Sequence, residues 1–203
     1  MKNLTLRQRI LASFLAILAI MALMVVMDYR RLLVIESEVE LINNDAVPGI
    51  YYSTSIRSSW FAGFVVVQGA FNMETEQERR SVLEALPQDD QLLEDHIAQY
   101  RRTITREDDR KMFEEFEKEL REYKRMRADI VAPAMLADPA RAQSLIKSEL
   151  RPAFYKGRDI LAKMVLENKK QADEAAIAIK QSVDSAEVRM LGSLAVAIIA
   201  AII

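Results

Sequence analysis

Two uncharged apolar stretches constrain this chain more than any other feature of its sequence. Residues 10–27 contain no charged side chain, and residues 190–203 are all uncharged and either apolar or small. A helix that crosses the hydrocarbon core of a membrane needs about 20 apolar residues, with a working range of about 17–25. We therefore predict a first transmembrane helix at 10–27 and the start of a second, truncated one at 190–203.

A cleaved signal peptide and a buried core helix are the alternatives to these membrane helices. The basic residues Lys2, Arg7 and Arg9 resemble the start of a signal peptide, but the apolar stretch is long and no Ala-x-Ala cleavage pattern follows it. A core helix would keep one polar face, which residues 190–203 lack. Both observations favour membrane helices.

The segment between the two stretches, residues 28–189, is rich in charge. It holds all 30 acidic residues and 25 of the 28 basic ones, because Lys2, Arg7 and Arg9 precede it, so its net charge is −5. Such a balance gives no drive toward nucleic acid. The absence of cysteine and the presence of one histidine disfavour thiol, zinc and di-iron chemistry. No nucleotide-binding or hydrolase motif is found, so we expect no catalytic residue, metal or cofactor.

Residues 28–189 carry the periodicity of amphipathic helices. Apolar positions recur at alternating steps of three and four, as in Leu32, Ile35, Val39 and Ile42. This is the spacing of a helical seam. Four such segments joined by short connections predict an all-α fold, an up-down-up-down four-helix bundle whose helices 1 and 4 continue as the transmembrane helices.

Capping patterns and prolines predict where the helices begin and bend. Thr75–Glu78 matches a capping box and Thr105–Asp108 resembles one, while Asp138–Pro139 places a capping carboxylate before a proline. Pro48 and Pro87 predict a kink or a break. From Arg158 to Leu191 there is neither proline nor glycine, so helix 4 is expected to run unbroken toward the second membrane helix.

The membrane-proximal part of the bundle predicts a homodimer. Helices 2 and 3 are shorter than helices 1 and 4, so a stem of two helices remains near the membrane. The seam formed by Leu32, Ile35, Val39 and Ile42 would be exposed on that stem. A second copy of the chain would bury it.

Three segments carry a resemblance to a known family. They are the basic residues 1–10, the helix 1 sequence Asn43–Pro48 and the helix 4 sequence Leu150–Phe154. With the order of membrane helix, helical domain and membrane helix, the chain resembles the N-terminal half of a bacterial transmembrane chemoreceptor. More narrowly, it resembles the four-helix-bundle sensor domain of methyl-accepting chemotaxis proteins.

This resemblance implies a topology and a function. Residues 1–9 would be cytoplasmic, and residues 28–189 would be a periplasmic ligand-binding domain held at the inner membrane. Helix 4 would pass the signal to cytoplasmic signalling partners through a C-terminal half that this sequence lacks. The same bundle occurs on histidine kinases and cyclic-nucleotide enzymes, which is one alternative. A structural or partner-binding membrane bundle without a small-molecule site is the other.

Two arginines on the seams mark the candidate ligand site. Arg57 precedes Glu74, near the expected distal tip, by 17 residues, and Arg158 follows Arg141 by the same number. Two guanidinium groups at one height suit a small carboxylate such as an organic or amino acid. In the family's amino-acid receptors, arginines of helix 1 act across the dimer interface with groups of helix 4. The other predicted ligand-binding residues are Thr54, Trp60, Phe61, Phe154 and Tyr155.

Ion pairing is the alternative role for these arginines. Arg57 and Arg158 could pair with Asp90, with Glu94 or with each other's neighbours, or extend to solvent. Arg127 and Arg151 form a second basic candidate, which we expect to be solvated.

Overall fold

The computed structural model describes residues 5–202, and no strand occurs among them. The predicted segments 1–9 and 190–203 lie partly outside these residues. The chain divides into two compact units, residues 43–172 and the combination of residues 1–42 with 173–203. We call the first the bundle unit and the second the stem unit. The elements are α1 Leu6–Leu41, η1 Ile42–Ala46, α2 Val47–Ala70, α3 Glu76–Leu83, α4 Leu86–Thr103, α5 Glu107–Ile130, α6 Pro133–Ala137, α7 Pro139–Leu145, η2 Ile146–Leu150 and α8 Arg151–Ile202.

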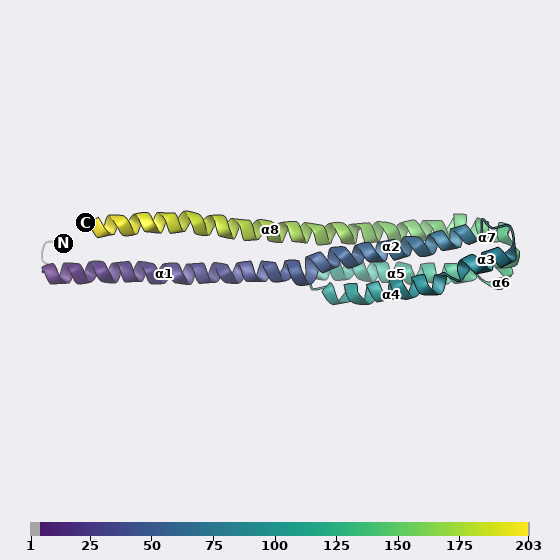
Figure 1. Ribbon diagram of the computed structural model, residues 1–203, viewed down its shortest axis with the longest axis horizontal. Helices are drawn as coiled ribbons and strands as arrows, with labels where there is room; N and C mark the ends of the chain where they lie inside the picture. Colours follow the sequence, from purple (N-terminus) through teal and green to yellow (C-terminus); the bar gives the residue numbers. More distant parts are fainter. Residues whose placement is uncertain (1–4, 203) are drawn as a thin grey trace. The chain divides into compact units, whose positions relative to one another are not determined.

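The bundle unit is a four-helix bundle, as predicted. In it, α2, α4, α5 and the first part of α8 run alongside one another, and the short helices α3, α6 and α7 lie at one end (Figure 1). Aromatic side chains pack around Trp60 in the core of this unit. Trp60 is 2% exposed, and its ring centroid lies 4.3 Å from that of Tyr123 and 5.6 Å from that of Phe116. Burying an apolar side chain of this kind contributes about 1.5–3 kcal/mol.

Proline shapes two of the helices through short π-helical segments. The segments η1 and η2 each end two residues before a proline, Pro48 and Pro152 respectively. A proline ring clashes with the carbonyl group four residues earlier, here that of Asn44 or Ser148. The wider π-helical turn contains that carbonyl in both cases and so accommodates the ring. The interruption predicted at Pro48 is therefore such a turn, and the helix continues through it.

Two of the predicted helix starts are confirmed. The Thr75 hydroxyl accepts a bond of 3.2 Å from the backbone N–H of Glu78, whose carboxylate accepts one of 3.0 Å from the N–H of Thr75. The bonds that the Thr75 N–H and the Thr75 hydroxyl donate to this carboxylate lower the pKa of Glu78. Asp138 accepts a bond of 3.1 Å from the backbone N–H of Arg141. The break expected at Pro87 is also present, between the end of α3 and the start of α4.

The helix start predicted at Thr105 was wrong in its chemistry. Helix α5 does begin at Glu107, but Arg106 precedes it and makes no capping bond with its side chain. The Thr105 hydroxyl instead donates to the carboxylate of Asp45 on η1. A tertiary contact has taken the side chain that the local pattern assigned to the helix.

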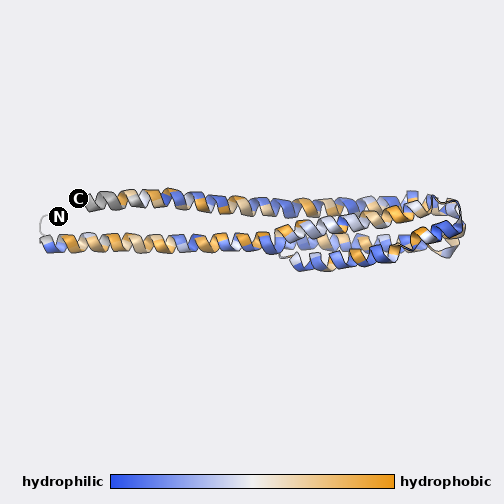
Figure 2. Cartoon of the chain, viewed as in Figure 1, coloured by the Kyte–Doolittle hydropathy of each residue, from blue (hydrophilic) through white to orange (hydrophobic). Residues whose placement is uncertain are grey.

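The stem unit contains the apolar stretch of α1. Figure 2 shows the first part of α1 as largely hydrophobic. Among the described residues, one helix is long and apolar enough to cross a membrane by length and composition; it lies in the run Ile10–Ala70, and the most apolar window of that run is not buried. Two seam residues of α1, Leu32 and Val39, are 58% and 40% exposed. Helix α8 is continuous to Ile202, which confirms the unbroken helix predicted from Arg158 to Leu191.

Candidate functional site

A groove between α2 and α8 contains nearly all of the predicted ligand-binding residues. Its volume is about 720 Å³, and it lies within the bundle unit. Six of the seven predicted residues line it, and the seventh, Tyr155, lies beside it. The lining residues are Thr54, Arg57, Ser58, Trp60, Phe61, Phe154, Arg158, Asp159 and Ala162. We call it the Arg57 groove.

Close packing of α8 against α2 forms the floor of the Arg57 groove. The indole N–H of Trp60 donates a bond of 3.1 Å to the backbone carbonyl of Phe154. Gly157 lies over the same indole, and a Cβ atom on this glycine would come within 2.5 Å of Cζ2 of Trp60. A residue without a side chain is therefore required where the two helices approach.

Aromatic rings give the groove a layered apolar wall. Phe154 is 2% exposed, whereas Phe61 is 58% exposed, with 6.1 Å between their ring centroids. Phe64 stacks beneath Phe154 at 4.1 Å. One ring is thus fixed in the core while another stands at the rim, where it can contact a bound molecule.

Within the part of the chain that the structure describes, neither arginine of the groove has a carboxylate partner on another helix. Arg57 is exposed and has no ion pair or hydrogen bond with any residue that the structure describes. Arg158 bonds only the neighbouring Asp159, at 2.7 Å, and its guanidinium carbon lies 4.7 Å from the ring centroid of Tyr155. Tyr155 therefore positions Arg158 without lining the groove. Asp159 offsets the positive charge in part.

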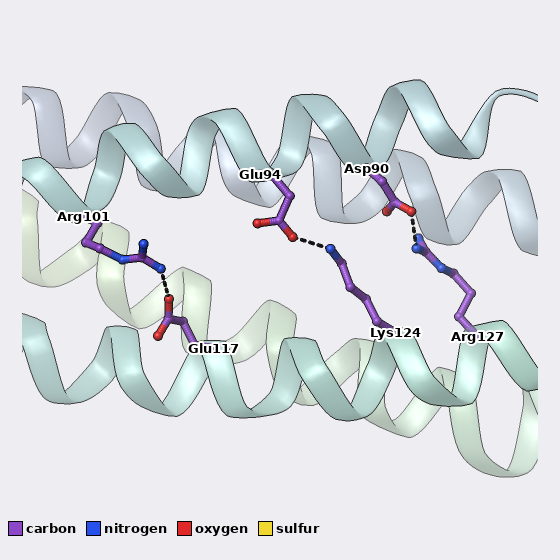
Figure 3. A network of polar contacts seen from close by, with 6 residues as sticks. All are labelled: Asp90, Glu94, Arg101, Glu117, Lys124 and Arg127. Carbon is purple, nitrogen blue, oxygen red and sulfur yellow. Dashed lines mark hydrogen bonds and ion pairs between the residues drawn. The ribbon is translucent and has the colours of Figure 1, made fainter.

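Asp90 and Glu94, the carboxylates proposed as alternative partners, belong to a different set of ion pairs. Between α4 and α5, Arg127 contacts Asp90 at 2.5 Å and Lys124 contacts Glu94 (Figure 3). Arg101 and Glu117 form a third contact of this kind. We call these three pairs the α4–α5 ladder. The ladder removes Asp90 and Glu94 as partners for the arginines of the groove.

One expectation about the second basic candidate was wrong. Arg127 was expected to be solvated, but it is only 8% exposed. Its guanidinium carbon lies 5.8 Å from the ring centroid of Tyr123. The side chain is held inside the bundle by an aromatic ring and by its ion pair with Asp90.

Sequence reasoning missed three lining residues of the groove, namely Ser58, Asp159 and Ala162. Helical spacing could have found two of them. Ser58 lies four residues after Thr54, and Ala162 lies four residues after Arg158, so each shares a helix face with a predicted residue. Among the described residues, no group of three or more histidine, aspartate or glutamate side chains could hold a metal ion.

Comparison with known families identifies the fold and its general role. A family model described as the four-helix-bundle sensory module for signal transduction matches residues 3–183. The chain belongs to this family. The sensory module is that of methyl-accepting chemotaxis proteins, as the resemblance in sequence implied. No curated protein and no solved structure gives a match.

Membership in the sensory-module family settles the class of function. This module is a part of membrane-associated chemoreceptors and acts in signal transduction, so the chain takes part in signalling with downstream partners. The module is sensory rather than catalytic. In this module, the Arg57 groove combines two guanidinium groups, one of them without an ion pair among the described residues, with exposed aromatic surface.

Proposed function

We propose that this chain senses a small carboxylate, such as an organic or amino acid, in the Arg57 groove of a bacterial chemoreceptor. The observation that carries the proposal is the pair of arginines without a cross-helix carboxylate in a groove lined by aromatic rings. A guanidinium binds a carboxylate through two parallel hydrogen bonds. The volume of about 720 Å³ lies within the range of small-molecule sites, about 300–1,000 Å³.

The remaining lining suits a ligand with an apolar or cyclic body. Phe61 and Phe154 offer ring faces, and Thr54 and Ser58 offer hydroxyl groups. A carboxylate would bind at Arg57 and Arg158 while the apolar body packs on the rings. Asp159 lies beside Arg158 and suits a ligand that also carries an amino group.

A homodimer is part of this proposal. The exposed face of α2 carries large apolar residues at helical spacing, with Val47, Tyr51, Phe61 and Val65 each at least 45% exposed. Their steps of four, ten and four follow a coiled-coil seam, as do those of the α1 seam. A second copy that covers this face would close the Arg57 groove, so both copies could contribute to binding.

The proposed topology follows from the apolar stretches. Residues 10–27 would cross the inner membrane, residues 28–189 would lie in the periplasm, and residues 190–203 would begin the return crossing. The N-terminal residues 1–9 would then be cytoplasmic. Lipid would be the surroundings of both membrane helices.

The ligand would act by shifting the population of two close packings of α8. Phe154 and Arg158 lie on α8, which continues without a break to Ile202. A ligand that binds one packing more tightly favours it by its differential affinity. A shift of about an ångström in α8 would then be passed along a single helix, which is a known type of signalling movement.

A thermal-shift screen tests the proposal. The full chain, purified in detergent, is heated with amino acids, aliphatic acids and aromatic acids. A ligand at 100 times its Kd adds about 2.7 kcal/mol of stability. We expect a carboxylate to raise the melting temperature, and Arg57→Ala to abolish the increase. Without ligand, Arg57→Ala should change stability by less than about 0.5 kcal/mol, because the side chain is exposed.

The control variant is Arg125→Ala, which removes an exposed arginine of α5 outside the groove. It should keep the ligand response. A response that survives Arg57→Ala would leave the sensory role intact but contradict the site. No response from a folded dimer would instead favour a module that senses through a partner protein.

A further inference from the structure

A set of polar side chains, separate from the Arg57 groove, lies fully buried near the turn between α4 and α5. It comprises Asp45 on η1, Tyr100 on α4, Asp109 on α5, and Asn168 and Gln171 on α8, and none of them is more than 1% exposed. We call it the buried polar cluster. None of its members lines the Arg57 groove. The proposed ligand site therefore gives no reason for its presence.

Hydrogen bonds of the cluster join α4, α5 and α8, and a further bond ties η1 to the turn before α5. The hydroxyl of Tyr100 donates to Oδ1 of Asp109 at 2.5 Å. The amide of Asn168 donates to the Tyr100 oxygen at 2.9 Å. Thr105, in the turn before α5, donates to Oδ2 of Asp45. The cluster thus links α4, α5 and α8 directly, and η1 through the turn between α4 and α5.

The cluster contains more acceptors than donors. Four oxygens have no hydrogen-bond partner: Oδ1 of Asp45, Oδ2 of Asp109, Oδ1 of Asn168 and Oε1 of Gln171. Only one donor group in the cluster is unpaired, the amide nitrogen of Gln171. An unpaired buried polar group costs about 1–3 kcal/mol. A proton added to a carboxylate turns one acceptor into a donor and also removes a buried charge.

The charges around Asp109 also favour a proton there. Burial raises the pKa of Asp109 above its ordinary value of 3.8, and the carboxylates of Asp45 on η1 and Glu167 on α8 raise it further. The hydrogen bond from Tyr100 and the positive charge of Arg106 act in the opposite direction. Glu167 itself lies 3.6 Å from Lys170, an exposed residue of α8.

We propose that the buried polar cluster is a proton-binding site, through which the sensory module responds to pH as a second stimulus. The proton resides on Oδ2 of Asp109, a buried oxygen without a hydrogen-bond partner, and neutralises the charge of that carboxylate. When this proton leaves for solvent, the carboxylates of Asp45 and Asp109 are both buried and charged. Their charges are not balanced within the cluster, because Asp45 has no basic partner there. Their repulsion weakens the contact between η1 and the start of α5.

The position of the cluster relates the proton to signalling. Asp45 lies two residues inside one boundary of the bundle unit, and Gln171 lies one residue inside the other. Helix α1 leads directly into η1, and α8 continues past Gln171. A change in packing at the cluster therefore acts on both segments of chain that leave the bundle unit.

The raised pKa fixes the direction of the pH dependence. The folded protein holds the Asp109 proton more tightly than the unfolded chain does. The resulting stabilisation is fully present below the ordinary carboxyl pKa and is lost as the pH rises through the folded pKa. Between the two values, the folding equilibrium constant falls about tenfold per pH unit for one proton.

Urea unfolding of the full chain across pH tests this inference. In detergent, the wild-type protein should lose stability as the pH rises through the window above 3.8. Asp109→Asn should remove most of that slope, because an amide does not titrate. The matched control Asp108→Asn changes the neighbouring, exposed carboxylate in the same turn of α5 and should keep the slope.

Infrared spectroscopy gives a readout that does not depend on folding of the Asp109 variant. Within that window, the wild-type protein should show the C=O stretch of a protonated carboxylic acid. Asp45→Asn removes the like charge, so this signal should then be lost at a lower pH. Arg57→Ala should leave the signal and the slope unchanged, which separates this inference from the proposed carboxylate site.

Two results would overturn the proton site. The first is a protein without the carboxylic acid signal and with the same pH slope in wild type and Asp109→Asn. The second is a stability that depends on added Ca²⁺ or Mg²⁺, is lost with a chelator and is independent of pH, since a cation would then balance the two carboxylates.

Discussion

The two helix pairs that make up the bundle differ in whether their basic side chains form ion pairs with the facing helix. Between α4 and α5, the cations Arg101, Lys124 and Arg127 each contact a carboxylate on the facing helix (Figure 3). Between α2 and α8, Arg57 has no partner among the described residues, and the ion pair of Arg158 is with the next residue in sequence. The α2–α8 pair is held instead by aromatic packing around Trp60 and by the hydrogen bond from its indole to Phe154.

This difference separates a cation that has a structural role from one that is available to a ligand. A paired guanidinium has its charge balanced and part of its hydrogen-bonding capacity used. An unpaired one keeps both for an incoming anion. Packing and the Trp60 hydrogen bond join α2 and α8 without an ion pair of either arginine between the two helices, among the described residues. The following predictions test whether packing stabilises the α2–α8 pair and ion pairs stabilise the α4–α5 pair.

The largest effect is expected where α8 packs on α2. Gly157→Ala would place a Cβ atom 2.5 Å from Trp60, whose indole is enclosed by Phe116, Tyr123 and Phe154. An overpacked core costs up to about 3 kcal/mol. Urea unfolding should show this loss.

The control for this variant is Gly69→Ala, since Gly69 also lies in a helix but has no atom within 4 Å of the added Cβ. Alanine is favoured over glycine in a helix by about 1 kcal/mol, so this variant should be neutral or more stable. Equal losses in both variants would contradict the close approach at Trp60.

An intermediate effect is expected at the most buried pair of the α4–α5 ladder. The side chain of Arg127 is 10% exposed, and that of its partner Asp90 is 32% exposed. Arg127→Met keeps much of the packing but leaves Asp90 without its cation. The loss should be about 2 kcal/mol, the scale of a hydrogen bond to a charged group. Arg125→Met, on the exposed face of α5, should be nearly neutral, and an equal loss there would contradict the prediction.

The smallest effect is expected at the exposed end of the ladder. Arg101 has a side chain that is 60% exposed, and an ion pair of this kind contributes about 0.2–1 kcal/mol. Arg101→Met should therefore lower stability by less than about 1 kcal/mol. Because salt screens exposed charges, the difference from wild type should shrink in high salt. A larger loss that does not depend on salt would indicate that Arg101 acts through packing.

The sequence predicted most of the secondary structure because local signals suffice for it. The cap at Thr75 needs only a hydroxyl and a carboxylate three residues apart, and neither group has a competing partner among the residues described. The pattern at Thr105 looks similar, yet its hydroxyl bonds Asp45, which lies 60 residues away in the chain. No local pattern contains that contact, so the capping prediction failed there.

The candidate site could be assembled in part from helical spacing. Residues that share a face of one helix follow from the 3.6-residue period, so the arginines and their aromatic neighbours could be named together. Their role in binding stays a prediction. Whether Arg57 or Arg127 had a partner could not be known, because ion pairs join different helices and depend on side-chain direction.

By itself, the sequence determined that this protein is an all-α sensory bundle joined to an apolar helix. Hydrophobic periodicity, capping patterns and the uncharged stretch of α1 act over a few helical turns, and each is visible in a linear chain. Only the tertiary structure decided which charges are balanced. It paired Arg127 with Asp90, left Arg57 open, and brought Asp45 and Asp109 into one buried cluster. Burial and pairing are properties of neighbours in space, and helix packing alone selects those neighbours.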